Sequence, residues 1–283
     1  MLWFYLLLIS VFGSAIANVF RRVAMKYDKS DAVASAVVFQ FIGALLVGMV
    51  ALWHGFVLPP IARYPWNVIA QAIFWGGATL SLFQASRYLE ASETAIITSG
   101  SAIVTIFLSV LLLHESFTFA YSFGTILILI SIYLISSQKK VSFNKGTVFA
   151  IVFCLLAGLG NTNDAYMLKY SHSDTLSLLT LGFFAPGIFL LLVHPRVVKK
   201  IVPLFHPSHI VRVFLLTFFY AMAAIAYFFA IHVGGEASRA SAINQSEIIL
   251  TVVIGAIFLN ETDRPWKKIV SALLVTAGVL LLS

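Results

Sequence analysis

Residues 83–115 read FQASRYLEASETAIITSGSAIVTIFLSVLLLHE, and residues 229–261 read FAIHVGGEASRASAINQSEIILTVVIGAIFLNE. The two stretches align without a gap when the chain is shifted by 146 residues. A shift of 143 residues aligns the earlier part, where the pattern Lys-Tyr-x-x-Ser-Asp at 26–31 returns at 169–174. Matched residues include Glu90 with Glu236, Thr105 with Thr251 and Glu115 with Glu261. The sequence therefore predicts an internal duplication.

The composition sets the class of protein. Of the 283 residues, 60% are hydrophobic and only 10% are charged, and the mean hydropathy is +0.98. A soluble domain carries about 25% charged residues. Ten membrane spans of about 20 residues each would use about 200 residues and leave only short connections. This excludes a sizeable soluble domain, and with it most kinases, nucleotide hydrolases and nucleic-acid-binding proteins.

Apolar runs bounded by charge, proline or turn residues predict ten spanning helices. They cover residues 2–25, 32–53, 66–88, 92–113, 117–136, 146–168, 174–194, 209–233, 237–259 and 265–283. The two-residue alternation of membrane β-strands is not found in these runs. We predict an all-α integral membrane protein of ten transmembrane helices, with five-helix repeats at 1–138 and 144–283. Because five is odd, the second repeat enters the membrane from the opposite side, which makes the repeats inverted.

The basic residues test this arrangement independently. The odd-numbered connections hold fifteen of the 18 Lys and Arg residues: Arg21, Arg22, Lys26, Lys29, Arg87, Lys139, Lys140, Lys145, Arg196, Lys199, Lys200, Arg212, Arg264, Lys267 and Lys268. The even-numbered side holds Arg63, Lys169 and Arg239. Such a bias is expected only if the repeats are antiparallel. The positive-inside rule then predicts odd-numbered connections in the cytoplasm and both termini outside. We expect a multi-pass protein of the plasma membrane.

The fourth span of each repeat ends in a glutamate followed by a hydroxyl residue, Glu115-Ser116 and Glu261-Thr262, and begins with Glu-Ala-Ser. With the ten spans and the duplication, these features resemble the EamA family of the drug/metabolite transporter superfamily. The resemblance implies a secondary transporter, and more specifically an exporter, of small metabolites such as amino acids or amines, working by alternating access. It also implies termini in the cytoplasm, contrary to the charge bias, so the orientation stays open.

Glu247 lies about ten residues into the ninth span, where an ionisable side chain costs about 2.5 to 3.5 kcal/mol on insertion scales. Such a carboxylate could bind a substrate amine or carry a coupling proton, or it could hydrogen-bond across helices as a packing contact. The equivalent stretch of the first repeat offers hydroxyl groups. The predicted substrate-binding residues are Glu247, Asn244, Gln245, Ser99, Ser101, Gln71, Gln84 and His232, of which the histidine is equally explained as an interfacial residue.

Aromatic side chains could add cation–π contacts for an ammonium group. The candidates are Trp75, Tyr88, Tyr166, Tyr220 and Tyr227. Aromatic residues are abundant in this chain, with 25 Phe alone, so the alternative is that these rings face lipid or neighbouring helices.

Charges of opposite sign occupy equivalent positions in the two repeats. Asp164 aligns with Arg21 at the shift of 143 residues, and Glu93 aligns with Arg239 at the shift of 146. We predict two symmetry-related ion pairs, Arg21 or Arg22 with Glu93 and Asp164 with Arg239, that open alternately as gates. The alternative is that both pairs are static contacts at the membrane boundary.

Two positions are predicted hinges. Pro186 interrupts the seventh span, where proline removes a backbone hydrogen bond, and Gly43 occupies the matching place in the second span. Kinked helices let one half of a transporter rock against the other. Proline and glycine are also common in passive membrane helices, so a purely structural role stays open.

Other functions fit the sequence less well. We expect no enzyme activity and no cofactor, because no phosphate-binding loop or catalytic triad is found and the connections are poor in paired acids and histidines. His194, His206 and His209 lack a carboxylate or thiolate companion for a metal site, and Cys154 is the one cysteine. A lipid or lipid-carrier flippase is the alternative function. The expected partners are a small-molecule substrate and the lipid bilayer without nucleic acid, and both proton coupling and a homodimer are compatible with the sequence.

Overall fold

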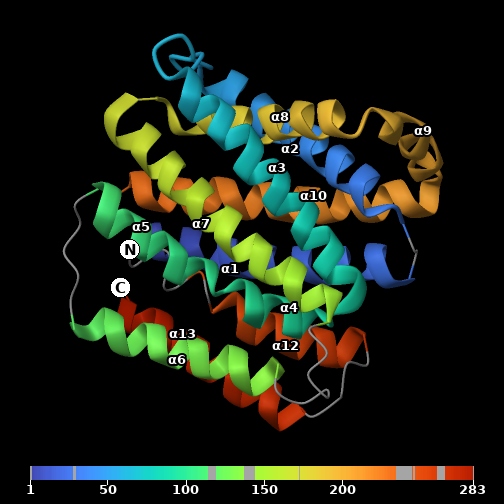
Figure 1. The fold of residues 1–283 in the computed structure, drawn as a ribbon. Coiled ribbons are helices and arrows are strands. Elements are labelled where there is room, and N and C mark those ends of the chain that lie inside the picture. Colours follow the sequence, from blue (N-terminus) through green and yellow to red (C-terminus); the bar gives the residue numbers. More distant parts are fainter. Residues whose placement is uncertain are drawn as a thin grey trace.

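The chain folds entirely into helices in a computed structural model, within residues 2–27, 30–113, 119–136, 144–171, 173–233, 244, 246–259 and 265–282, which are the residues that the structure describes (Figure 1). The helices of the first half are α1 (Leu2–Arg22), continued by η1 (Val23–Tyr27), α2 (Ala32–His54), α3 (Pro65–Tyr88), α4 (Ala91–Thr98), α5 (Ser101–Leu113) and α6 (Phe119–Ser136). Those of the second half are α7 (Lys145–Ser171), α8 (Thr175–Val193), η2 (Pro195–Val197), α9 (Val198–Ile201), η3 (Val202–Phe205), α10 (Pro207–His232), α12 (Glu247–Phe258) and α13 (Pro265–Leu282).

Six of the described helices are long and apolar enough to cross a membrane. They are α1 with most of η1, α2, α3, α7, α8 and α10. The segment Ser122–Ser131 within α6, and α12, are apolar but shorter. The all-helical class and the multi-pass character are therefore confirmed, whereas the number of ten spans stays a prediction.

Two pairs of equivalent helices from the two halves, α2 with α8 and α6 with α13, pack antiparallel. In α2 and α8, Gly43 lies against Phe183 and Gly187 lies against Phe41, so one helix ascends as the other descends. Figure 1 shows α2 beside α8 and α6 beside α13. In that second pair, the Ser131 hydroxyl donates to the Ser271 carbonyl at 2.8 Å. Each pair joins equivalent helices of the two repeats, which is the packing that an inverted duplication requires.

Two crossings related by the duplication achieve close packing in opposite ways. Where α1 crosses α10, a Cβ atom on Gly13 would lie 2.8 Å from the Phe219 carbonyl oxygen and 3.0 Å from Ala223 Cβ. The equivalent crossing joins α7 and α3, and there Leu156 lies against Gly77. Gly13 aligns with Leu156, and Ala223 aligns with Gly77. The glycine therefore lies on the first helix of one crossing and on the partner helix of the other. Small residues allow such close approach of membrane helices.

The predicted hinge positions lie in the α2–α8 contact. Pro186 is a buried residue inside α8, and the ring of Phe183, one turn earlier, fills the space beside Gly43. A Cβ atom on Gly43 would approach that ring to 2.4 Å. Gly43 is therefore required for packing, while its role as a hinge stays a prediction.

The predicted single helix over 92–113 is wrong in one respect, because the structure divides it. α4 ends at Thr98 and α5 begins at Ser101. The Thr98 hydroxyl donates to the Thr94 carbonyl at 2.8 Å and the Ser99 hydroxyl donates to the Ile96 carbonyl at 2.6 Å. Such bonds compete with the helix and favour a break, which Gly100 also allows. In the second repeat, α12 begins at Glu247, the residue that aligns with Ser101.

Candidate substrate site

A row of polar side chains follows one face of α1. Its members are Ser10, Ser14, Asn18 and Arg21, spaced three or four residues apart, as one helix face requires. They face a second row at the start of α12, made of Asn244, Glu247 and Thr251. Since the contacts advance in the same direction along both helices, α1 and this segment run parallel.

The contacts along this seam converge on Glu247. The Ser10 hydroxyl donates to Asn244 Oδ1 at 2.6 Å. Asn18 Nδ2 lies 3.5 Å from Glu247 Oε1 and 3.4 Å from Thr251 Oγ1. The Ser14 hydroxyl also hydrogen-bonds with the Glu247 carboxylate. Glu247 thus faces protein donors rather than lipid.

Arg21 lies at the end of the same row and is 5% exposed. Its guanidinium donates to Asn18 Oδ1, and it interacts electrostatically with Glu247. Its Nε atom is buried and has no hydrogen-bond partner among the residues that the structure describes. A buried donor without an acceptor costs free energy, so this nitrogen is available to an added acceptor.

Asp164 forms a second carboxylate site on α7. Gln71 Nε2 and Trp75 Nε1, both from α3, donate to its two oxygens at 2.8 Å each. One turn along the same contact, the Asn67 amide donates to Asn163 Oδ1 at 2.8 Å, and Asn163 Nδ2 donates to the Asn67 carbonyl at 3.0 Å. Both carboxylate oxygens are therefore held in place by side chains of the other repeat.

Tyr220 of α10 lies within electrostatic range of both carboxylates. It interacts electrostatically with Arg21, Glu247 and Asp164, which come from α1, α12 and α7. Its ring packs against Phe39 at a centroid distance of 5.2 Å. We call Arg21, Asp164, Tyr220 and Glu247 the polar centre. Asp164, Tyr220 and Glu247 lie among helices, and each retains some exposed surface.

The sequence located part of this centre. Asn244, Glu247 and Gln71 make the contacts described above, and Asp164 and Arg21 belong to it although they were expected in gates. Ser99 bonds to its own helix, Ser101 begins α5 and Gln84 is a partly buried residue of α3. His232 ends α10, and its side chain, like the whole of Gln245, lies outside what the structure describes.

Ser10, Ser14 and Asn18 were not predicted. Their spacing of four residues on an otherwise apolar helix is the signal that could have found them. The buried pair in which Gln40 Nε2 donates to Thr79 Oγ1 at 2.7 Å was also not predicted.

The structure describes only some of the residues of the predicted gates. Glu93 closes a capping box at the start of α4, where its carboxylate accepts from the Glu90 backbone at 3.1 Å, and Arg22 donates to the Ser86 carbonyl at 2.7 Å. Arg239 lies outside the described residues, as do Glu115-Ser116 and Glu261-Thr262. On the face where pairing of Glu93 was expected, the structure has an ion pair between Glu90 and Lys268 of α13.

The sequence model of the EamA-like transporter family matches residues 1–137 and again residues 144–283. The chain belongs to the EamA-like transporter family. A comparison with proteins of curated function finds no match. A protein of known crystal structure, 14% identical, superimposes with a TM-score of 0.64 over 98% of this chain and 96% of its own, and at that identity it supports the fold alone. Family membership makes the chain a membrane protein of a transporter family.

Proposed function

We propose that this protein is a secondary transporter of a small metabolite that carries an amine, such as an amino acid or a simple amine. It would work as an exporter in the plasma membrane, by alternating access between two inverted repeats of five spans. The observation that carries the proposal is the polar centre, in which two carboxylates and one guanidinium surround Tyr220. Ionisable groups within membrane helices usually mark a substrate or ion pathway.

The charges of the polar centre favour a cationic substrate group. Asp164 and Glu247 together outnumber Arg21 by one negative charge when both carboxylates are ionised. Buried charges are costly unless they are paired. An ammonium group, or a proton on one carboxylate, would balance the excess, and this supports coupling to a proton. A substrate carboxylate could also accept from Arg21 Nε, which would suit an amino acid.

Alternating access also needs contacts that open. On the face that holds the N-terminal end of α4, the Glu90–Lys268 pair links the first repeat to α13. On the other face, the Asn67–Asn163 pair links α3 to α7. We propose that these two contacts separate alternately while α2 and α8 bend near Gly43 and Pro186. Pairing of Arg21 with Glu93, and of Asp164 with Arg239, stays a prediction for another conformation.

Uptake into proteoliposomes tests the proposal. The full chain would be reconstituted and offered a panel of labelled amino acids and amines, with and without a pH gradient. We expect uptake of at least one amine-bearing compound, and we expect Glu247→Gln and Asp164→Asn to reduce it by about 10- to 100-fold, the equivalent of losing a charged hydrogen bond. Thr105→Val, on α5, is the matched control and should retain uptake. Full gradient-driven uptake in both carboxylate variants would refute the assigned site.

A lipid or lipid-carrier flippase is the second candidate, and one observation favours it. An apolar groove of about 660 Å³ lies between α1, α2 and α10, lined among others by Met49, Trp53 and Ala226. An acyl chain would fit such a groove, although the polar centre is not among its lining residues. If the protein moves lipids, Met49→Trp should block the scrambling of a fluorescent lipid in vesicles. If it moves small amines, the same variant should leave amine uptake unchanged.

A further inference from the structure

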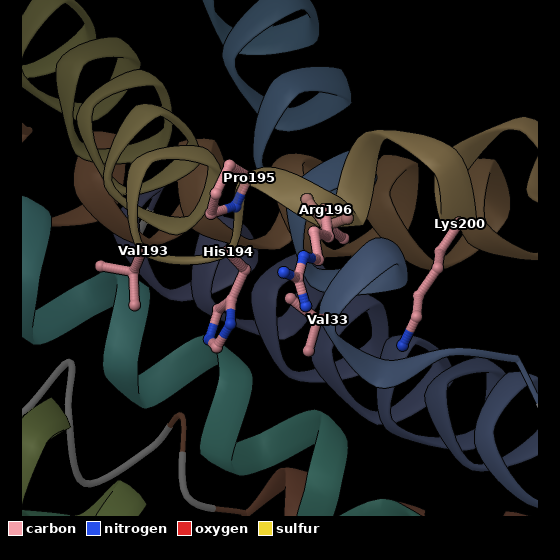
Figure 2. Close-up of a pocket in the computed structure, with 7 residues that line it drawn as sticks. Val33, Val193, His194, Pro195, Arg196 and Lys200 are labelled. Carbon is pink, nitrogen blue, oxygen red and sulfur yellow. The ribbon is translucent and has the colours of Figure 1, made fainter.

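A second polar site lies at the end of the bundle where α8 gives way to η2 and α9. A pocket of about 400 Å³ opens there, lined by Val33, Val193, His194, Pro195, Arg196, Val197 and Lys200. Figure 2 shows the side chains of His194, Arg196 and Lys200 projecting from the same side of this segment. The lining contains no acidic residue. The pocket therefore has the charge that an anion requires.

Asp31 places a carboxylate next to the pocket, and this carboxylate is already occupied. Asp31 caps α2, because its Oδ1 accepts from the backbone of Val33 and Ala34 at 3.0 and 3.1 Å. Its Oδ2 accepts from Lys200 Nζ at 2.8 Å. Asp31 thus neutralises Lys200 and holds it at the rim, while the positive end of the α2 helix dipole remains directed toward Val33. Arg196 is exposed and leaves the pocket with net positive charge.

The pocket lies at the level of a membrane surface. α2 has 23 residues and is about 34 Å long, close to the thickness of a bilayer hydrocarbon core. Its far end carries Trp53, 89% exposed, and α3 begins beside it with Trp66, 79% exposed, as expected of an interfacial aromatic belt. The pocket adjoins the opposite end, at Val33. It is therefore within reach of lipid headgroups at the other interface.

The segment beside the pocket has the character of an interfacial anchor. Val198, Val202 and Phe205 are exposed apolar residues, and Val197 and Leu204 are buried. Lys199 and Lys200 lie between them along the chain. Short segments that combine exposed apolar and basic side chains lie in the headgroup region, with apolar groups toward the acyl chains and charges toward phosphate. Figure 1 shows α9 at the extreme end of the bundle, where such a segment would meet lipid.

We infer that this pocket, which we call the His194–Lys200 pocket, binds the phosphate of an anionic phospholipid, with Arg196 and His194 facing the phosphate and the exposed valines and Phe205 facing the acyl chains. The pocket adjoins an odd-numbered connection, which the bias of Lys and Arg assigns to the cytoplasmic side. Basic pockets on that side bind anionic headgroups. This inference is independent of the transported substrate. It assigns the pocket a structural lipid that would hold α2, α8 and α9 together.

The test uses the purified full chain in mild detergent, titrated with short-chain phosphatidylglycerol, short-chain phosphatidylcholine and inorganic phosphate, with binding followed by native mass spectrometry. We expect phosphatidylglycerol to bind more tightly than either other probe. We expect Arg196→Gln to weaken its binding roughly fivefold, the usual effect of one basic residue near an anionic lipid. Arg196→Lys should retain most of the affinity because the charge is kept.

Lys199→Gln is the matched control, because Lys199 is exposed in α9, three residues after Arg196, but does not line the pocket. It should change the affinity less than twofold. An equal loss in Lys199→Gln and Arg196→Gln would mean diffuse surface attraction and would overturn the proposal. Binding of inorganic phosphate as tight as that of phosphatidylglycerol would also overturn it, since the site would then serve a soluble anion.

Discussion

The seam between α1 and α12 and the seam between α7 and α5 are related by the duplication, and they differ in one important way. In the first, Asn18 Nδ2 lies 3.4 Å from Thr251 Oγ1, and in the second, Asn161 Nδ2 lies 3.5 Å from Thr105 Oγ1. The same asparagine–threonine contact has thus been kept in both halves. Next to it, Glu247 in one seam is replaced by Ser101 in the other. The two seams share the same helix packing. They differ because the α1–α12 seam carries a negative charge, that of Glu247, where the α7–α5 seam has Ser101.

The hydrogen-bond partners of Arg21 and Asp164 also differ between the two repeats. Arg21 and Asp164 are equivalent, but Asp164 receives two donors from α3, Gln71 and Trp75. The α10 residue that aligns with Gln71 is Thr217, whose hydroxyl donates to its own helix at the Val213 carbonyl. Arg21 consequently depends on Asn18 of its own helix and on Glu247. The duplication produced two similar crossings that a few substitutions have made different. Asp164 has a hydrogen-bond donor for each carboxylate oxygen, whereas Arg21 Nε lacks an acceptor among the described residues.

The largest expected effect comes from removing the cation at the first crossing. Arg21→Gln should abolish transport and lower the free energy of unfolding by roughly 3 kcal/mol, because it leaves Glu247 without its counter-charge. Thermal unfolding of the purified protein and proteoliposome uptake measure the two effects. The double variant Arg21→Gln with Glu247→Gln should regain stability but not transport. If the double variant were as unstable as the single one, the coupling between these residues would be absent.

The next largest expected effect is a loss of stability on substitution of Gly13, at the crossing of α1 with α10. Gly13→Leu should destabilise the protein by about 2 kcal/mol, because the new side chain meets the Phe219 carbonyl and Ala223. Adding Ala223→Gly reproduces the arrangement of Leu156 and Gly77 at the equivalent crossing and should restore at least half of that loss. Thermal unfolding measures both changes. No recovery in the double variant would show that the two crossings are not interchangeable.

Substitutions of the equivalent residues Asn18 and Asn161 test which of the two seams contributes to transport. Asn18→Leu should lower the rate of uptake about tenfold, since it removes contacts with Arg21 and Glu247 at once. Asn161→Leu is the matched change at the equivalent position and should leave uptake within twofold of the unchanged protein. Initial rates under one pH gradient provide the comparison. Equal losses would assign the same importance to both seams and contradict the asymmetry.

The smallest effect concerns the equivalent helix caps Asp31 and Asp174. Burial raises the pKa of Asp31, but the hydrogen bonds from Lys200 and the α2 backbone outweigh it and lower the pKa below its ordinary value. A carboxylate with a lowered pKa stabilises the fold above its unfolded pKa, and this contribution is lost as the pH falls through the folded pKa. Asp174 instead caps α8 with the help of Ser177.

We expect Lys200→Gln to reduce the acid-dependent part of the stability by a few tenths of a kcal/mol, as for exposed ion pairs. Thermal unfolding from pH 7 down to about pH 3, repeated with Asp174→Asn as the comparison, measures the change. An unchanged acid profile in Lys200→Gln would mean that Lys200 does not stabilise the Asp31 carboxylate.

The sequence alone was sufficient for the class and the plan of this protein. Apolar runs of helical length, the repetition at 143 and 146 residues and the distribution of Lys and Arg predict a duplicated, inverted membrane protein. The resemblance to the EamA family implies a transporter. Family membership and the helical structure confirm the class. These features are readable because insertion into lipid depends on local composition and length, which the sequence carries residue by residue.

The tertiary structure decided which polar residues meet. Glu247 and Asp164 stand out in the sequence as charges within apolar runs, but nothing in the sequence assigns Asn18, Trp75 or Tyr220 to them as partners. Whether such a residue faces lipid, another helix or the polar centre depends on the rotation of each helix, and that rotation is set by contacts between distant segments such as Gly13 with Ala223. The basic pocket beside α9 likewise arises only when separate parts of the chain come together, because side-chain packing between helices is not encoded in the periodicity of any one of them.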